Sequence, residues 1–225
     1  MALNIVREID DRVSVRNVLV SVSDKTGLET LIPGLVAVCP DVRIYSTGGT
    51  FTAIQAMPGV GSRNLVQVSD YTGQPEMQGG LVKTLDFRIY LGLLSETYNP
   101  AHVADLQRTG SVAIDLVVVN LYPFKKTVAA PNVTPEEART NIDIGGPCMI
   151  RASAKNYLRV ASVTDPADYP SVLDEIRQSK GSIGLDLRLR LMQKAFQHTA
   201  AYDAAIAAFF SAVAPAATRQ TYTLH

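Results

Sequence analysis

Short runs of apolar residues alternate along the chain with segments whose apolar positions recur every three or four residues. The apolar runs predict strands at 18–22, 42–45, 65–68, 114–120 and 159–163. The run at 114–120 is apolar almost throughout, which is typical of a strand buried on both faces of a parallel sheet. Residues 74–96 show no clean period, and no element is predicted there.

Helical periodicity fills the segments between these strands. It predicts helices at 26–38, 50–57, 100–108, 146–156, 166–178 and 186–210, with another after a capping box that begins at Thr134. The alternation of strands and helices predicts an α/β fold, a three-layer sandwich around a mostly parallel sheet. We expect one domain at 18–210, an N-terminal arm at 1–17 and a C-terminal tail at 211–225.

Composition narrows the classes of function. The 225 residues contain 21 Lys and Arg against 21 Asp and Glu, so the formal net charge is zero. A chain without excess positive charge is a poor candidate for binding nucleic acid or an anionic membrane surface. An anionic ligand would therefore need a local cluster of donors and cations. Two cysteines, Cys39 and Cys148, are too few for a disulfide framework, and no residue spacing suggests a metal site.

Neither the start of the chain nor its longest apolar stretch suggests a targeting or membrane segment. Charged residues interrupt the first eleven positions, which argues against a signal peptide. The longest apolar stretch, 114–124, contains Asp115 and Asn120 and is too short to span a bilayer. We therefore expect a cytoplasmic protein.

Two loops that follow predicted strands have the composition of phosphate-binding loops. Residues 21–27 and 46–50 each combine hydroxyl side chains, glycine N–H groups and the start of a helix, and Lys25 adds positive charge. In open α/β sheets, ligands bind at the carboxyl ends of the strands, where both loops are expected. The alternative is that both loops are ordinary turns, in which Ser, Thr and Gly cap helices.

Three further segments place polar or ionisable groups beside strand ends or helix starts. They are Lys83-Thr84, the segment 120–124 after the central strand, and the segment 143–146 before a helix that carries Arg151 and Lys155 on one face. The alternative makes Asp143 a helix cap and the two cations part of a solvated surface.

Several sequence segments occur in an order that resembles the inosine monophosphate (IMP) cyclohydrolase family. They are residues 21–27, 46–50, 68–73, 75–77, 82–85, 115–124, 141–147, 152–156 and 194–203. The resemblance covers about residues 18–210 and implies a methylglyoxal-synthase-like fold. It also implies ring closure of formyl-AICAR (FAICAR) to IMP with loss of water, without a cofactor, by a homodimer. A separate AICAR formyltransferase is then expected to supply the substrate.

The resemblance also assigns roles to residues of this chain. Its substrate-binding residues are Ser23, Asp24, Lys25, Thr47, Gly48, Gly49, Thr50, Thr84, Asn120, Ile144 and Gly145. Its catalytic residues are Lys83, Tyr122, Asp143 and Lys155. Lys155 is expected to donate a proton to the departing hydroxyl, oriented by Asp143. Lys83, Tyr122 and the N–H groups near Gly145 are expected to stabilise the oxyanion.

The chain departs from the family pattern at a few positions. Leu81 stands where the family has arginine, Asp86-Phe87 replaces His-Pro, and Tyr157 replaces a histidine. These changes leave open a second hypothesis, a purine-nucleotide-binding regulatory module with weakened catalysis. A third, methylglyoxal synthase, is less favoured because that family lacks counterparts of residues 120–124 and 194–200.

Overall fold

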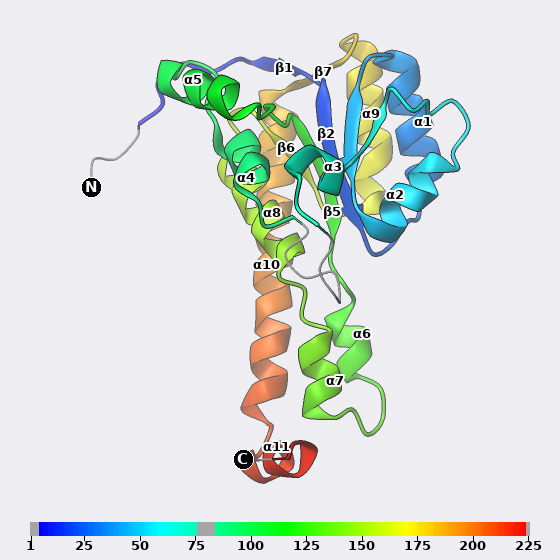
Figure 1. Ribbon diagram of the computed structural model, residues 1–225, viewed down its shortest axis with the longest axis vertical. Coiled ribbons are helices and arrows are strands. Elements are labelled where there is room, and N and C mark those ends of the chain that lie inside the picture. Colours follow the sequence, from blue (N-terminus) through cyan, green and yellow to red (C-terminus); the bar gives the residue numbers. More distant parts are fainter. Residues whose placement is uncertain (1–4, 76–83, 224–225) are drawn as a thin grey trace.

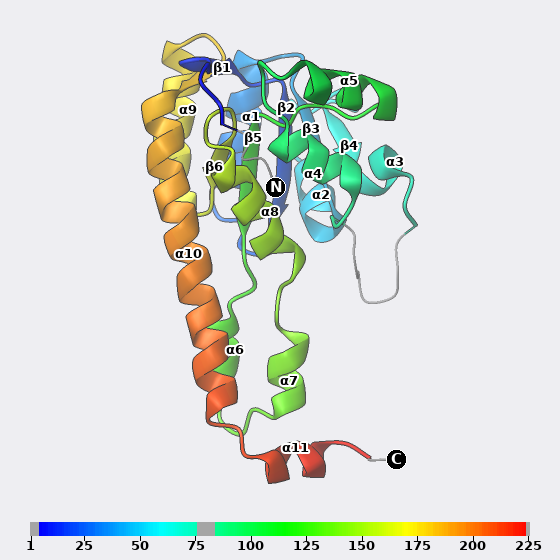
Figure 2. The ribbon, with the colours of Figure 1, turned by 90° about the vertical axis from the view of Figure 1, so that its left-hand side faces the viewer.

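A parallel sheet forms the centre of the protein. The computed structural model describes residues 5–75 and 84–223, and within them five parallel strands lie in the order β4-β3-β2-β5-β6 (Figures 1 and 2). The strands are β2 (Asn17–Val22), β3 (Arg43–Ser46), β4 (Leu65–Gln67), β5 (Leu116–Asn120) and β6 (Ala161–Val163). The strands predicted from the sequence are thereby confirmed. The chain also forms an antiparallel pair that was not predicted, β1 (Arg12–Ser14) with β7 (Ser182–Gly184).

Helices cover both faces of the sheet. Because alternate residues of a strand point to opposite faces, Val18 and Val20 pack on one side and Leu19 on the other. The first side is covered by α1 (Leu28–Val38) and α9 (Tyr169–Gln178), and the second by α4 (Phe87–Leu94) and α8 (Gly145–Lys155). The three-layer α/β fold is thereby confirmed.

The long helix α10 (Leu185–Ser211) joins the two layers. Leu187 and Leu191 in its first turns belong to the core on the α1 side, whereas Ala195 and Tyr202 belong to the core on the α8 side. The helix therefore runs past the β6 edge of the sheet, and its later turns project beyond the sheet (Figure 2).

A helical extension lies beside and below the projecting part of α10. It consists of α6 (Phe124–Val128), α7 (Pro135–Thr140) and α11 (Pro215–Thr221), which lie below the sheet in both views (Figures 1 and 2). Thr134 caps α7 with the predicted capping box. Among the described residues no single helix is long and apolar enough to cross a membrane. Only α10 and α11 together meet that length and composition, and they are bent by 89°.

The remaining described helices are short and lie in the segments that connect successive strands. They are α2 (Gly48–Gln55), α3 (Val68–Thr72), α5 (Pro100–Thr109) and the 3-10 turn η2 (Pro166–Asp168). Helix α4 lies in the segment for which the sequence predicted nothing. It begins there because the Asp86 carboxylate accepts a hydrogen bond from the N–H of Arg88, at 2.7 Å, and so caps the helix.

A buried arginine attaches the N-terminal segment to the domain. Arg188 on α10 is 0 % exposed, and its guanidinium donates to the carbonyls of Asp10 and Asp11 at 2.7 and 3.0 Å. It also donates to the carbonyls of Tyr157, Leu158 and Ile183. Five buried donors are therefore satisfied by backbone alone, which fixes residues 10–11 against the start of α10.

Candidate active site

A cavity of about 610 Å³ lies at the carboxyl ends of β2, β3 and β5, between the first turns of α2 and α8. It brings together most of the residues proposed from the sequence. Those that line it are Ser23, Lys25, Thr47, Gly48, Gly49, Thr50, Thr84, Asn120, Tyr122, Asp143, Ile144 and Gly145. Segments far apart in the sequence therefore meet where parallel strands end, as expected for a ligand site in this class of fold.

Asn120 organises the loop that follows β2. Its side-chain oxygen accepts hydrogen bonds from the N–H groups of Ser23 and Asp24, at 2.7 and 2.9 Å. Its amide nitrogen donates to the Asp24 carbonyl at 2.8 Å. Because both ends of the amide are engaged, Asn120 shapes the loop that presents Ser23 and Lys25 to the cavity.

Asp24 does not line the cavity. Its carboxylate accepts a hydrogen bond from the N–H of Thr26 at 2.9 Å, and hydrogen bonding to Thr26 holds the pKa of Asp24 below its usual value. Asp24 therefore stabilises the turn before α1, and its contact with a substrate remains a prediction.

The loop after β3 ends in the first turn of α2. Thr47 is the N-cap of this helix, and its carbonyl accepts from the N–H groups of Thr50 and Phe51. The N–H groups of Gly48 and Gly49, in the first turn, have no acceptor within the helix and can bind an anion. A Cβ on Gly49 would meet nothing within 4 Å, so the backbone here faces open space.

Thr50 connects this loop to the neighbouring strand. Its hydroxyl donates to the Val22 carbonyl at 3.0 Å and lies 3.2 Å from the Val22 nitrogen. Thr50 is 5 % exposed. Its hydroxyl therefore holds α2 against the end of β2, which leaves the N–H groups of Gly48 and Gly49 as the donors that this loop offers to a ligand.

The opposite wall is the turn before α8. The Asp143 carboxylate accepts hydrogen bonds from the N–H groups of Gly146, at 2.9 Å, and of Tyr122. Burial nevertheless raises the pKa of Asp143 above its usual value. Tyr122 lies beside it and is exposed to the cavity. The wall thus presents a carboxyl group suited to proton transfer near a phenol and a helix N-terminus.

Close packing explains the two glycines at the start of α8. A Cβ on Gly145 would lie 2.6 Å from the Thr84 hydroxyl, and one on Gly146 would lie 2.5 Å from the Asp143 carboxylate. Thr84 is buried and lines the cavity from the segment before α4. Glycine at both positions therefore lets Thr84, Asp143 and the first turn of α8 meet at one point.

Two of the proposed catalytic lysines are not placed in this cavity. Lys83 lies outside the described residues. Lys155 is the last residue of α8, ten residues after Gly145, which puts it about 15 Å along the helix axis from the cavity wall. Its side chain is exposed and does not line the cavity. The structure therefore does not place Lys155 in this cavity, and its role as a proton donor remains a prediction.

The structure also adds residues that the sequence did not indicate. Leu85, Thr140, Ile142 and Met149 complete the walls. Met149 lies one turn after Gly145 on the same face of α8, so the helical period gave a signal for it. Thr140 and Ile142 follow α7 in an irregular segment, and no pattern in the sequence marks them.

The departures from the family pattern lie away from the cavity where the structure describes them. Asp86 caps α4, and its carboxylate also accepts from the Gln74 amide at 2.7 Å. Tyr157 offers its carbonyl to Arg188, and neither residue lines the cavity. Leu81 lies outside the described residues. Neither Asp86 nor Tyr157 is therefore part of the cavity wall, although Leu85, next to Asp86, is.

Metal ligands do not gather in the described part of the chain. Within residues 5–75 and 84–223, no group of three or more His, Cys, Asp or Glu side chains is arranged to hold a metal ion. Cys39 and Cys148 are both free thiols.

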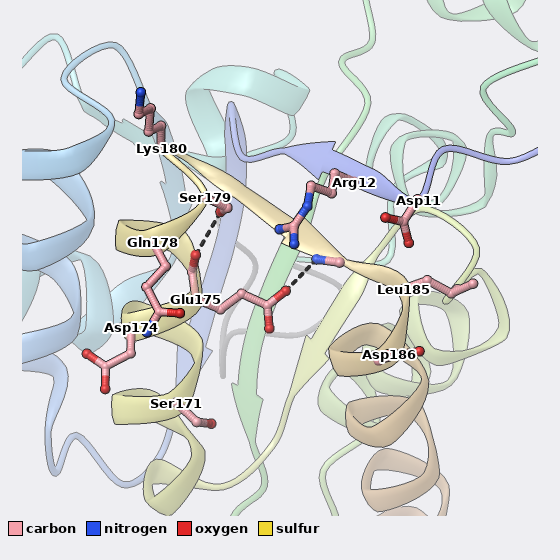
Figure 3. A pocket seen from close by; sticks show the side chains of 11 residues that line it. Asp11, Arg12, Ser171, Asp174, Glu175, Gln178, Ser179, Lys180, Leu185 and Asp186 are labelled. Atoms are coloured by element: carbon pink, nitrogen blue, oxygen red, sulfur yellow. Dashed lines mark hydrogen bonds between the residues drawn. The ribbon is translucent and has the colours of Figure 1, made fainter.

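A second cavity, of about 970 Å³, lies on another part of the surface (Figure 3). It is formed by β1, α9, β7 and the first residues of α10, and Glu175 within it accepts from the N–H of Gly184 at 2.6 Å. Its charged groups are Asp11, Asp174, Glu175 and Asp186 against Arg12 and Lys180. The excess of carboxylates disfavours a phosphate ligand here, so the smaller cavity is the candidate site.

Comparison with known proteins agrees with the fold. The model of the MGS-like domain family matches residues 28–148, and that of the AICARFT/IMPCHase bienzyme family matches residues 153–225. The solved structure described as "Crystal structure of ForH" superposes with a TM-score of 0.76 at 32% sequence identity, covering 87% of this chain and 97% of that one.

Curated relatives extend the match to purine biosynthesis. The bifunctional purine biosynthesis protein PurH of Lactiplantibacillus plantarum is 46% identical over 198 residues, and that of Enterococcus faecalis is 50% identical over 196. Each alignment covers 87% of this chain but only 37% of the relative, so the chain spans somewhat more than a third of their length. The chain therefore belongs to the MGS-like domain family, in the form that the AICARFT/IMPCHase bienzymes contain.

Proposed function

We propose that this domain closes the ring of FAICAR to give IMP, with loss of water. The observation that carries the proposal is the composition of one cavity, in which the anion-binding turn of Gly48 and Gly49 faces the same space as the Asp143 carboxyl group. The similarity to bifunctional purine biosynthesis proteins supports a purine nucleotide as the ligand.

The phosphate end of the substrate is assigned to the first turn of α2. The N–H groups of Gly48 and Gly49 and the positive end of the helix dipole favour a dianionic phosphate. Ser23 adds a hydroxyl and Lys25 adds a positive charge from the loop that Asn120 holds. A protein with zero net charge can capture an anionic nucleotide in this way without a basic surface.

The reacting end of the substrate is assigned to the wall formed by Tyr122, Asp143 and Gly145. The carboxamide nitrogen attacks the formyl carbon, so a C–N bond forms and negative charge develops on the formyl oxygen. The N–H groups at the start of α8 and the Tyr122 hydroxyl stabilise that oxygen. Because an amide is a poor nucleophile, holding both groups in contact supplies much of the rate, with effective molarities of about 10⁵–10⁸ M.

Asp143 is the group we assign to proton transfer. As the carboxylate, it accepts the proton that the carboxamide nitrogen loses during attack. It returns that proton to the oxyanion, which becomes the hydroxyl of the cyclised intermediate. It then takes the N–H proton of the former formamido nitrogen and passes it to this hydroxyl, so the C–O bond breaks, a C=N bond forms in the ring and water departs. A carboxyl group whose pKa is raised by burial is a better base than an ordinary aspartate and is suited to both steps. Lys83 remains a prediction for oxyanion stabilisation.

The second hypothesis is a nucleotide-binding module without turnover. Leu81, Asp86 and Tyr157 favoured it in the sequence. Leu81 lies outside the described residues, and Asp86 and Tyr157 do not line the cavity. The homodimer and the separate formyltransferase remain predictions.

Incubation of the purified protein with FAICAR, with IMP formation followed by its ultraviolet absorbance, separates the two hypotheses. We expect turnover. Tight IMP binding without turnover would support the binding module instead.

A further inference from the structure

Tyr202 on α10 contacts the turn that carries Asp143. Its hydroxyl accepts a hydrogen bond from the Asp143 N–H at 2.7 Å and lies 3.5 Å from the Asn141 carbonyl. The side chain is 8 % exposed and comes from a helix 59 residues further along the chain. Tyr202 does not line the cavity, so it has no direct contact with a substrate there.

The ring of Tyr202 also fixes the second segment that reaches the cavity. It packs edge-on against Phe124, with ring centroids 6.2 Å apart and an interplanar angle of 69°. Phe124 is 1 % exposed and comes two residues after Tyr122. The N–H of Tyr122 in turn donates to the Asp143 carboxylate. Tyr202 therefore contacts both segments of the wall at which the reaction is proposed, the one that carries Tyr122 and the one that carries Asp143.

We infer that Tyr202 is a positioning residue, whose hydroxyl fixes the backbone of Asp143 and so keeps its carboxyl group at the cavity wall. The inference rests on the proposed function. Ile144, the residue after Asp143, is 60 % exposed and has little packing of its own to hold the turn. The hydrogen bond that the Asp143 N–H donates to the Tyr202 hydroxyl therefore restrains the backbone of this turn, and small displacements of a reacting group reduce rates strongly.

The substitution Tyr202→Phe removes the hydroxyl and keeps the ring against Phe124. We expect kcat to fall about tenfold, which corresponds to about 1.4 kcal/mol in the barrier, while KM changes less than about twofold. The matched control is Tyr71→Phe, because the Tyr71 hydroxyl likewise accepts a backbone N–H, that of Val112 at 2.9 Å, and Tyr71 lines no part of the cavity. The control should lose as much thermal stability but keep kcat.

A double-mutant cycle distinguishes positioning from general loosening of the fold. If Tyr202 acts through Asp143, Tyr202→Phe will have no further effect on kcat in an Asp143→Asn background. Equal losses in both backgrounds, or equal losses of kcat in Tyr202→Phe and Tyr71→Phe, would overturn the inference.

Hydrogen exchange of the Asp143 amide tests the same contact without turnover. We expect exchange at Asp143 to accelerate at least about tenfold in Tyr202→Phe and to stay unchanged in Tyr71→Phe. If the wild-type protein fails to convert FAICAR, the proposed function fails while this measurement still decides whether Tyr202 fixes the turn. Unchanged exchange at Asp143 in Tyr202→Phe would overturn the inference.

Discussion

Replacing Arg159 by methionine should destabilise the protein strongly without altering its cavity. Arg159 is 6 % exposed, and its guanidinium lies 3.2 Å from the carboxylate of Asp115, which is 8 % exposed. It also donates to the carbonyls of Gly92, Ser95 and Ile114, at 2.5, 3.0 and 3.0 Å. These groups join the end of α4 to the amino-terminal ends of β5 and β6, at the edge opposite the cavity.

The expected magnitude follows from what the substitution leaves behind. Asp115 keeps the hydrogen bonds from the N–H groups of Arg16 and Asn17, both at 2.9 Å, but loses its positive partner. Removing one member of a buried ion pair typically costs about 3–5 kcal/mol, because the remaining charge is uncompensated. For a chain of this size, that loss lowers Tm by about 6–20 °C.

The assay is urea denaturation with Arg177→Met as the matched control. Arg177 and Asp174 form an exposed pair at 3.3 Å, with side chains 52% and 61% exposed, so their loss should cost less than about 1 kcal/mol. Asp115→Asn in the Arg159→Met background should recover part of the stability, since the unpaired charge is then absent. A loss for Arg159→Met no larger than that of the control would refute the reasoning.

The pH dependence of this loss has a definite sign. Burial raises the pKa of Asp115 in the folded state, so the cost of its charge is present at neutral pH and disappears as pH falls through the raised pKa. Without Arg159 the pKa of Asp115 rises further. The destabilisation by Arg159→Met should therefore be smaller at about pH 5 than at about pH 7.

Three further predictions concern the cavity. Gly49→Ala should fold normally, because the added Cβ meets nothing within 4 Å. It should weaken IMP binding at least about tenfold in calorimetry, since the methyl group occupies the proposed phosphate position, and unchanged affinity would contradict that placement. Asn120→Ala frees the N–H groups of Ser23 and Asp24, so the Kd for IMP should rise about tenfold, and an unchanged Kd would show that the loop holds its shape alone. Burial raises the pKa of Asp143, so kcat/KM should fall as pH drops through that pKa, and Asp143→Asn should remove this dependence; its persistence in the variant would assign it to another group.

The sequence was sufficient to locate the two phosphate-loop candidates, because their placement follows from the sheet. Residues 21–27 and 46–50 each follow a strand, and the carboxyl ends of parallel strands lie at one edge. The family resemblance then indicated the remaining segments of the site. Asn120, Asp143 and Thr84 from these segments line the cavity beside the two loops.

The sequence could not show which partner each polar side chain binds in the folded protein. Asn120 forms its hydrogen bonds with residues 96 and 97 positions away, so its role as a loop anchor depends on tertiary contacts. The same is true of Tyr202 and Asp143. The distance of Lys155 from Asp143, in contrast, could be predicted from the sequence. A helix rises about 1.5 Å per residue, so the predicted helix at 146–156 already placed Lys155 far from Asp143.

The most direct test of the central claim is conversion of FAICAR to IMP by the purified wild-type protein, measured in parallel with Asp143→Asn. We expect turnover by the wild type and a loss of at least about 100-fold in kcat for the variant, with IMP affinity retained in both. Wild-type protein that binds IMP but forms none from FAICAR would exclude ring closure by this domain, and wild-type turnover by Asp143→Asn would exclude Asp143 as the proton-transfer group.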